Sequence, residues 1–192
     1  PLTIMSTAFS LFRTSSTVVM GGPPATLADE EVLNKEKAVD IIVRGEGEET
    51  ILELAKQPET QEKLCNIKGI TFRKDTKIIQ TQNRPFIQDL DSLPLPAYKF
   101  VSVEKYWVAG RKLLPIITSR GCPYQCSFCV ASQMFGQQFR ARSPKKVLDE
   151  LEWLQNEFGA EGVAFQDDTL TFDRKRAEEI CDGIVDRKIK LH

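Results

Sequence analysis

The stretch KLLPIITSRGCPYQCSFC, residues 112–129, joins an apolar run to a loop that holds three of the chain's five cysteines. The run 112–121 has the continuous apolar character of a buried strand in a parallel sheet. The cysteines then follow with three and two residues between them, and no histidine is near. Parallel α/β folds carry their chemistry in loops after the carboxyl ends of strands, so this stretch predicts such a fold.

A helix is predicted after the cysteine loop. Ser143 is of the residue type that caps helices, and Pro144 is favoured at the first helical position. Gly159 supplies the stop. Between them, apolar residues recur at helical spacing at Val147, Leu148, Leu151, Leu154 and Phe158.

A second strand and helix repeat this unit. Residues 162–168, GVAFQDD, predict the strand, and Asp173 caps the helix. The apolar face of that helix consists of Ala177, Ile180, Cys181 and Ile184. Residues 188–192, KIKLH, are expected to open a third strand. Two consecutive βα units predict the start of a parallel barrel or half barrel, so we expect further strands outside these 192 residues.

The N-terminal half predicts a separate α/β sheet. Residues 17–22 form a short strand that ends in glycines, residues 29–36 form a helix, and residues 40–57 form a strand, a turn and a helix. The apolar face of the last helix consists of Ile51, Leu52, Leu54 and Ala55. Residues 66–82 read as a hairpin around KDTK, and three prolines within 84–100 mark a linker.

Composition excludes several classes of protein. Lys plus Arg number 26 against 27 Asp plus Glu, so charge implies no polyanionic partner. No apolar run reaches the length of about 20 residues that a membrane span needs. Residues 1–16 lack the apolar core and basic flank of a secretory signal. An odd number of cysteines also fits a cytoplasmic chain better than a secreted one.

Three thiols in one loop favour an iron-sulfur cluster. A structural zinc site takes four ligands, usually in two pairs, and a disulfide would leave one thiol over. Thiolates in a tight loop are the usual ligands of iron-sulfur clusters, and three of them would leave one iron of a four-iron cluster open for chemistry. Cys65 precedes a hairpin and Cys181 lies on an apolar helix face, where we expect a buried, unreactive thiol. Zinc and a disulfide remain as alternatives.

At these residues the chain resembles the radical S-adenosylmethionine (SAM) superfamily, whose signature is CxxxCxxC with an aromatic residue before the last cysteine. Cys122, Cys126, Phe128 and Cys129 match it. The resemblance implies a 4Fe-4S cluster on the three cysteines, whose open iron binds SAM and whose electron cleaves it to a 5′-deoxyadenosyl radical. It also implies that Phe128 packs near the adenine; an alternative is that it only anchors the loop.

The end of the second strand is where this family binds the methionyl amine of SAM. The corresponding residues are Gln166, Asp167 and Asp168, and carboxylates suit an ammonium group. The alternative is that the two aspartates only order the turn before Thr169. Arg140, Arg142, Lys145 and Lys146 form a basic cluster, which either neutralises an anion or solvates the start of a helix.

A second resemblance covers the N-terminal half. VVMGGPPAT, DIIVRGEGEETILEL and DLDSLPLPAY are similar to the trailing part of the cobalamin-binding domain that precedes many radical SAM enzymes. It implies that the turn residues Gly21, Gly22, Gly45, Glu46 and Gly47 approach the corrin ring. Glycine also ends strands generally, and acids are favoured in the first turn of a helix, which leaves a structural alternative. No Asp-x-His-x-x-Gly segment is present to supply an axial histidine.

The predicted fold class is therefore α/β. Residues 1–62 are expected to be the C-terminal part of a Rossmann-like cobalamin-binding domain, residues 63–111 a β-hairpin and Pro-rich linker, and residues 112–192 the first βα units of a radical SAM barrel of the partial TIM type.

The predicted function is that of a radical SAM iron-sulfur enzyme, with cobalamin as a further cofactor, for methyl transfer or rearrangement at an unactivated carbon. A small-molecule or peptide substrate and an electron donor such as flavodoxin or ferredoxin are expected, without membrane or nucleic acid. The alternatives are a methylthiotransferase acting on RNA or protein, and a non-catalytic metal-binding module. With its predicted further strands outside the chain, we expect these 192 residues to be a fragment that holds a cluster but does not turn over substrate.

Overall fold

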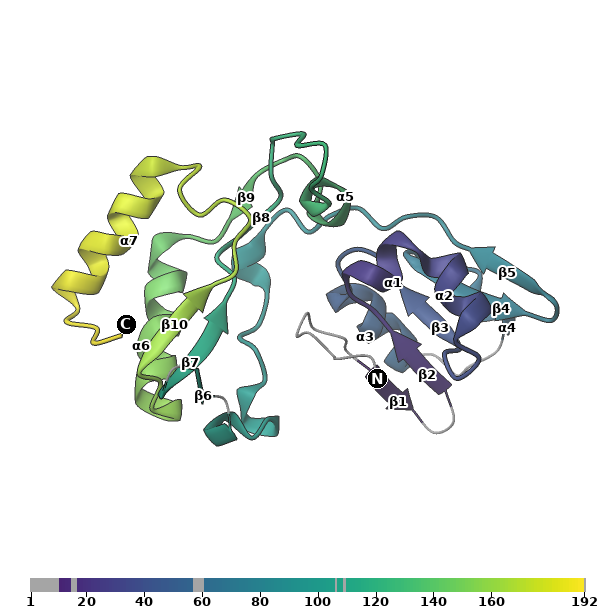
Figure 1. Cartoon of the computed structure of the whole chain (residues 1–192), viewed down its shortest axis with the longest axis horizontal. Coiled ribbons are helices and arrows are strands. Elements are labelled where there is room, and N and C mark those ends of the chain that lie inside the picture. The colour runs from purple at the N-terminus through teal and green to yellow at the C-terminus, as the bar shows by residue number, and fades with distance from the viewer. Residues whose placement is uncertain (1–10, 15–16, 57–60, 106, 109, 192) are drawn as a thin grey trace. The chain divides into compact units, whose positions relative to one another are not determined.

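The computed structural model describes residues 11–14, 17–56, 61–105, 107–108 and 110–191. Contacts divide the chain into two compact units (Figure 1). The N-terminal unit comprises Pro1–Ile87 and Phe128–Phe135, and the C-terminal unit comprises Gln88–Ser127 and Gly136–His192. The first division therefore falls between residues 87 and 88, whereas the predicted domain limits lie at 62/63 and 111/112. Most of the predicted non-signal segment 1–16 lies outside the described residues.

A five-stranded mixed sheet forms the N-terminal unit, in the order β1-β2-β3-β4-β5. Only β2 and β3 are parallel; the other neighbouring pairs are antiparallel. The predicted hairpin is confirmed, and it pairs with β3, so it belongs to this sheet. The strands are β1 Leu11–Thr14, β2 Thr17–Met20, β3 Ile41–Val43, β4 Ile70–Lys74 and β5 Lys77–Gln80.

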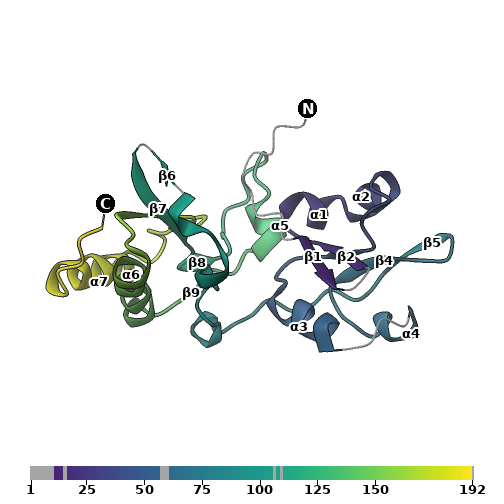
Figure 2. The same cartoon turned by 90° about the horizontal axis from the view of Figure 1, so that it is seen from below.

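Helices cover both faces of this sheet, as Figure 2 shows. Alternate residues of β3 point to opposite faces, so Ile41 and Val43 pack on the α3 side while Ile42 packs on the α1 and α2 side. The helices are α1 Pro23–Leu27, α2 Asp29–Lys35, α3 Glu48–Lys56 and α4 Gln61–Leu64. Two predicted core positions are wrong: Leu52 of α3 is 57% exposed and Ala55 is exposed as well, because Ile51 and Leu54 already face the sheet.

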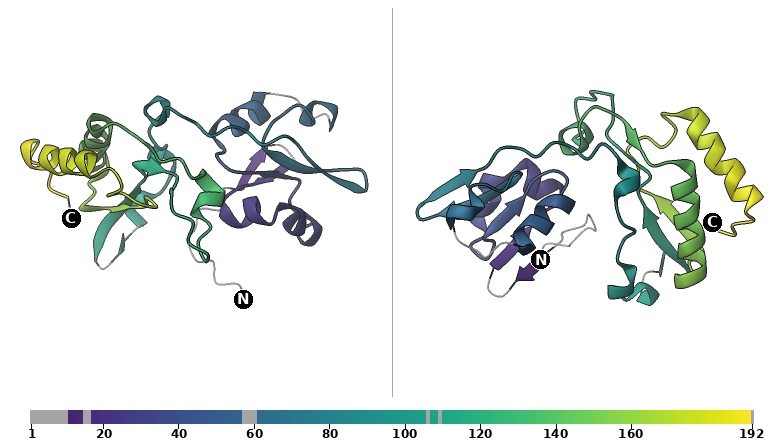
Figure 3. Two further views of the ribbon diagram at one scale, coloured as in Figure 1. Left: turned by 90° about the horizontal axis from the view of Figure 1, so that it is seen from above. Right: turned by 180° about the vertical axis from the view of Figure 1, so that it is seen from behind.

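In the C-terminal unit, β7 lies between β6 and β10. The β7–β10 pair is parallel and in register from Leu113 to Ile116, which confirms the predicted βα repeat. Helices α6 and α7 pack on this pair and on each other (Figure 3). The elements are η1 Leu90–Ser92, η2 Tyr98–Phe100, η3 Val103–Lys105, β6 Trp107–Val108, β7 Arg111–Ile116, β8 Ser119–Arg120, β9 Arg140–Ala141, α6 Pro144–Phe158, β10 Gly162–Phe165 and α7 Arg174–Asp186.

The predicted caps of α6 and α7 are confirmed. Ser143 Oγ accepts a hydrogen bond from Lys146 N at 3.3 Å, and Asp173 Oδ1 accepts one from Arg176 N at 3.0 Å. Gly159 takes the left-handed conformation at the end of α6, which glycine adopts without steric cost. These local signals fix where both helices begin and where α6 ends.

Two predictions at the C-terminal end are wrong. Cys181 is exposed, because Ile180 rather than its neighbour takes the inward position on α7. Residues 188–191 form no strand; Ile189 and Leu191 instead pack into the core as irregular backbone. His192, the last residue of the predicted strand, lies outside the described residues. Within the described part of the chain, no helix is both long enough and apolar enough to cross a membrane.

Candidate functional site

The cysteine loop has a closed base. Strands β8 and β9 pair across it, and Cys122 N donates to Gly136 O at 3.2 Å. Gly121 has a φ of 84°, and a Cβ at this position would overlap the carbonyl oxygen of Gln138. The close approach of the two loop ends therefore needs glycine immediately before the first cysteine.

The three loop cysteines have different surroundings. Cys122 is buried, with Sγ 3.4 Å from Thr169 Oγ1, whereas Cys126 and Cys129 are exposed. Cys129 Sγ accepts a hydrogen bond from Ala131 N at 3.5 Å, at the start of α5 Ala131–Phe135. All five cysteines are free thiols, so no disulfide forms. Among the described residues, no three Cys, His, Asp or Glu side chains are already arranged as a metal site.

The residues at the end of β10 lie beside the base of this loop, because β7 and β10 are parallel and in register. Asp167 accepts three hydrogen bonds: from Thr118 N at 2.7 Å, Thr118 Oγ1 at 2.5 Å and Ser119 Oγ at 2.6 Å. Its carboxylate thus ties the end of β10 to the residues that lead into the cysteine loop. This is a larger structural role than ordering its own turn.

Asp168 and Gln166 are exposed side chains on either side of Asp167. Partial burial of its carboxyl group, followed by the charge of Asp167, raises the pKa of Asp168. A cation would relieve both effects, since it stabilises the ionised form. Asp168 is therefore the member of the predicted trio best suited to meet an ammonium group.

Phe128 is 89% exposed, so it does not anchor the loop. The sequence patterns did not indicate a different aromatic cluster in the C-terminal unit. There, the ring of Phe172 lies 6.3 Å from that of Tyr124 and 5.0 Å from that of Phe139. The only signal available from the sequence was the presence of aromatic residues within and next to the cysteine loop.

The basic cluster divides into two kinds of residue. Arg140 is buried, and Arg142 is ion-paired with the buried Glu150. Lys145 is exposed and pairs with Asp149 at 2.6 Å, and Lys146 is exposed. The arginines are thus part of the folded interior, and the lysines form the solvated start of α6.

The predicted glycines gather at one edge of the N-terminal sheet, because β2 and β3 are parallel. Gly21 and Gly22 follow β2, and Gly45 and Gly47 follow β3; a Cβ on Gly21 would lie 3.6 Å from Val43 O. Gly22 and Gly45 have positive φ angles of 99° and 67°. Nothing lies within 4 Å of a Cβ built on Gly45, so its backbone is open on that side.

Glu46 does not share this openness. It is buried, and its Oε2 accepts a hydrogen bond from Ile87 N at 2.6 Å. Its carboxylate holds the end of the N-terminal unit's main segment, which favours the structural reading of this residue.

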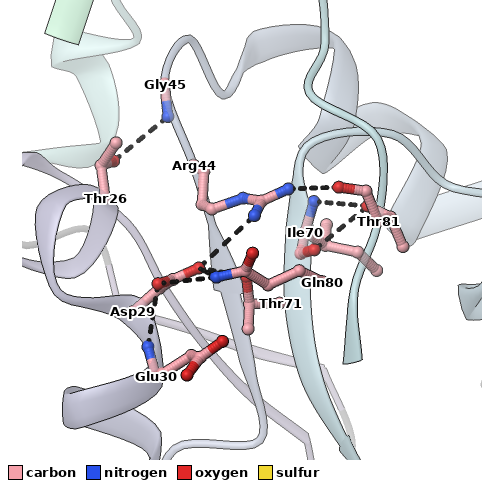
Figure 4. Close-up of polar contacts among 9 residues, drawn as sticks. All are labelled: Thr26, Asp29, Glu30, Arg44, Gly45, Ile70, Thr71, Gln80 and Thr81. Atoms are coloured by element: carbon pink, nitrogen blue, oxygen red, sulfur yellow. Dashed lines mark hydrogen bonds and ion pairs between the residues drawn. The ribbon is translucent and has the colours of Figure 1, made fainter. Parts of the chain in front are cut away.

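A polar network next to Gly45 was not indicated by the sequence (Figure 4). The buried Asp29 accepts hydrogen bonds from Thr71 Oγ1 at 2.5 Å and Gln80 Nε2 at 2.9 Å, and Arg44 Nη1 lies 3.5 Å from it. Gly45 N donates to Thr26 Oγ1 at 3.1 Å. The network fixes Arg44 and so the start of the glycine turn. From the sequence, Asp29 has only the appearance of an acid in the first turn of a helix.

The segment Phe128–Phe135, which includes the last loop cysteine, belongs to the N-terminal unit. Helix α5 contacts α1, which begins directly after Gly22, and Met134 of α5 is buried. The residues around Cys129 and the glycine edge are therefore parts of the same compact unit.

The comparisons with known proteins agree with this arrangement. Residues 116–190 match the family model "Radical SAM superfamily". The chain is 38% identical over 163 residues to an uncharacterized methyltransferase of Pyrococcus horikoshii, covering 85% of this chain and 36% of that protein. It is 35% identical over 175 residues to the anaerobic magnesium-protoporphyrin IX monomethyl ester cyclase of Synechocystis, covering 91% of this chain and 35% of that enzyme. The chain thus spans about a third of the length of these relatives.

Solved structures show the same fold. The cobalamin-dependent SAM radical enzyme OxsB, with aqua-cobalamin and SAM bound, superposes with a TM-score of 0.69 over 90% of this chain and 25% of its own, at 20% identity. The radical SAM methyltransferase TsrM from Kitasatospora setae, with cobalamin and a [4Fe-4S] cluster bound, gives 0.66 over 91% of this chain and 34% of its own, at 19% identity. Residues 116–190, with their CxxxCxxC loop after β7, thus match the radical SAM superfamily, and the chain has the same fold as the solved cobalamin-dependent radical SAM enzymes.

Proposed function

We propose that this chain is the cofactor-binding part of a cobalamin-associated radical SAM enzyme that acts by methyl transfer or cyclisation. The observation that carries the proposal is the three-cysteine loop at the carboxyl end of β7, within the matched residues 116–190. In this proposal the C-terminal unit contains the first βα units of a radical SAM barrel, and the N-terminal unit the trailing part of a cobalamin-binding domain. The relatives named as methyltransferases and cyclases support the reaction class.

The donor set of the loop fits a 4Fe-4S cluster. Cys122, Cys126 and Cys129 would each hold one iron, which leaves the fourth iron for SAM. Cys126 and Cys129 are exposed and reach a ligand without breaking a core contact, while Cys122 lies at the closed base of the loop. When bound, the cluster supplies the electron that cleaves the sulfonium of SAM.

The chain's own residues would orient the SAM molecule. Asp168 would meet its ammonium group, and Asp167 would hold Asp168 in place through the contacts with Thr118 and Ser119. Gln166 is exposed beside them and would complete this edge, and Phe128 would pack against the adenine.

The glycine edge would receive cobalamin. Gly21, Gly22, Gly45 and Gly47 leave backbone without side chains at the carboxyl ends of two parallel strands, where α/β sheets commonly bind ligands. Glu46 borders this edge, but its carboxylate is bonded to Ile87 N. His192 is the chain's one histidine, so no residue at the glycine edge would offer an imidazole to a bound corrin.

Reconstitution tests the proposal. Anaerobic incubation with iron and sulfide should give a brown protein with about four irons and a reducible paramagnetic signal. Cys122→Ala, Cys126→Ala and Cys129→Ala should each abolish it. Cys65→Ala and Cys181→Ala are matched controls that should not, because both thiols are exposed and neither belongs to the CxxxCxxC loop. Stoichiometric zinc without sulfide in the wild-type chain would contradict the proposal.

Two ligand measurements extend this test. With dithionite and SAM, the reconstituted chain should form 5′-deoxyadenosine, and Asp168→Asn should raise the SAM concentration needed. Equilibrium dialysis against hydroxocobalamin should show binding that Gly45→Val abolishes, because the new side chain fills the open side of the turn. Equal retention of hydroxocobalamin by the wild-type chain and by Gly45→Val would remove the glycine edge from the proposal.

A further inference from the structure

We infer that Thr169 is a positioning residue for the cluster, whose hydroxyl donates a hydrogen bond to the sulfur of Cys122 and raises the reduction potential. This inference rests on the proposed function, since it needs a cluster on Cys122. It assigns a role to a residue outside the CxxxCxxC loop and next to the Gln166–Asp168 turn.

Coordination of Cys122 to a metal would decide which atom of this contact donates the hydrogen bond. Thr169 Oγ1 lies 3.4 Å from Cys122 Sγ, and Cys122 is 9% exposed. In the free thiol either atom can be the donor. A metal ligand is a thiolate without a proton, so only the hydroxyl can then donate.

Neighbouring contacts hold Thr169 in this place. Asp167, two residues earlier, is fixed by its three hydrogen bonds to Thr118 and Ser119. On the other side, Phe172 N donates to Thr169 O at 3.2 Å and closes the turn. Cys122 is itself held by the hydrogen bond from its N to Gly136 O. Both partners of the contact are therefore fixed by backbone and carboxylate hydrogen bonds rather than by the contact alone.

The three cysteines differ in this respect. Cys129 Sγ accepts from a backbone amide, and Cys122 Sγ is the one that meets a side-chain hydroxyl among the described residues. A hydrogen bond to a cluster sulfur stabilises the more negative, reduced state more than the oxidised state. Removing the Thr169 hydroxyl should therefore make one-electron reduction of the cluster harder.

A potentiometric titration tests this. The reconstituted wild-type chain and three variants are reduced anaerobically with dithionite and redox mediators, one electron per cluster, and the reduced fraction is followed by electron paramagnetic resonance. Thr169→Val keeps the shape of the side chain and should shift the midpoint to a more negative potential. Thr169→Ser keeps the hydroxyl and should restore the wild-type midpoint. Thr171→Val is the matched control, because Thr171 is exposed in the same loop.

The outcomes separate the inference from the proposed function. Failure of the wild-type chain to take up a cluster would overturn both. Cluster uptake with the same midpoint in wild type and Thr169→Val would overturn the inference alone. If Thr169→Val is folded by circular dichroism but does not retain its cluster, cluster retention becomes the readout: recovery in Thr169→Ser supports the hydroxyl's role, and failure of Thr169→Ser to recover it overturns that role.

Discussion

Asp167 and Asp168 are adjacent in the chain and have opposite surroundings. The carboxylate of Asp167 accepts three hydrogen bonds from Thr118 and Ser119. Asp168 has a raised pKa, from partial burial first and the charge of Asp167 second. Asp167 therefore holds the end of β10 through its hydrogen bonds, whereas burial and the neighbouring charge oppose ionisation of Asp168.

Asp167→Asn should destabilise the C-terminal unit. An amide replaces one acceptor oxygen with a donor, which opposes the hydroxyl and amide donors already present. Loss of a hydrogen bond to a charged group costs about 1.5–3 kcal/mol. Thermal unfolding followed by circular dichroism should show a lower midpoint, with Asp182→Asn on the exposed side of α7 as a control that changes little.

Asp168→Asn should instead raise the unfolding midpoint at pH 7. Because the folded pKa is raised above the ordinary value of 3.8, the unfolded chain ionises more easily, and folding loses free energy at neutral pH. That loss shrinks as the pH falls below the folded pKa, and it is gone below the unfolded pKa of 3.8, where both states hold the proton. The gain from Asp168→Asn should therefore shrink between pH 7 and pH 4; a gain that grows on acidification would contradict the assignment.

The sequence predicted where this site lies better than it predicted what each of its residues does. The cysteine loop and the QDD turn each follow a strand that the apolar pattern predicts. The parallel pairing of these two strands alone therefore brings the loop and the turn to one edge of the sheet. Which aspartate is bonded depends on Thr118 and Ser119, which come 49 and 48 residues before it. No periodic pattern records a side-chain contact at that separation.

At the scale of structural elements, the conformation of the cysteine loop depends on how its two ends meet. The β8–β9 pair and the Cys122 to Gly136 hydrogen bond close it, and Gly121 sits at the point of closest approach. The loop can therefore be opened at its base without changing any cysteine.

Gly121→Ala should open this base. Its Cβ would overlap the backbone of Gln138, and the residue would also hold a left-handed φ that costs about 1–3 kcal/mol for a non-glycine residue. Backbone cannot move aside as a flexible side chain would. We expect a lower unfolding midpoint and lower iron retention after reconstitution; Gly110→Ala, which has a similar φ of 76° but open space around it, should affect the iron content less.

Helix ends were predicted well at this scale, because Ser143, Asp173 and Gly159 act through hydrogen bonds within one turn of the backbone. The buried faces of the helices were predicted less well. Leu52 and Cys181 are adjacent to true core positions on their helices, and an apolar residue beside the stripe satisfies the same pattern. The third strand failed for another reason: a strand needs a partner, and residues 188–191 pack against helices and β10 instead.

For the molecule as a whole, the main feature is that the chain returns to its first unit. Phe128–Phe135 belongs to the unit built mostly from Pro1–Ile87, and α5 contacts α1. Linker composition indicated a division near 84–100 but could not indicate this return, because a short loop helix has no long apolar pattern.

Met134→Ala should therefore loosen the N-terminal unit. Met134 is buried on α5, and truncation of a buried methionine costs about 2–5 kcal/mol. Hydrogen exchange read by mass spectrometry should show faster uptake in peptides covering α1 and α2. Leu52→Ala, on the exposed side of α3 in the same unit, is the control; equal exchange in both variants would show that α5 does not support α1.

The return of Phe128–Phe135 also affects the order in which a ribosome can complete this protein. After Ile87 has been added, 48 more residues, 88 to 135, must be synthesised before the first unit has all its parts. At about 5–20 residues per second this takes roughly 2–10 s. All three loop cysteines are added to the chain during that interval, before α6 and β10 have been made. The first unit therefore lacks a part until the cysteine loop has been synthesised, and Thr169, which contacts Cys122, is added later still.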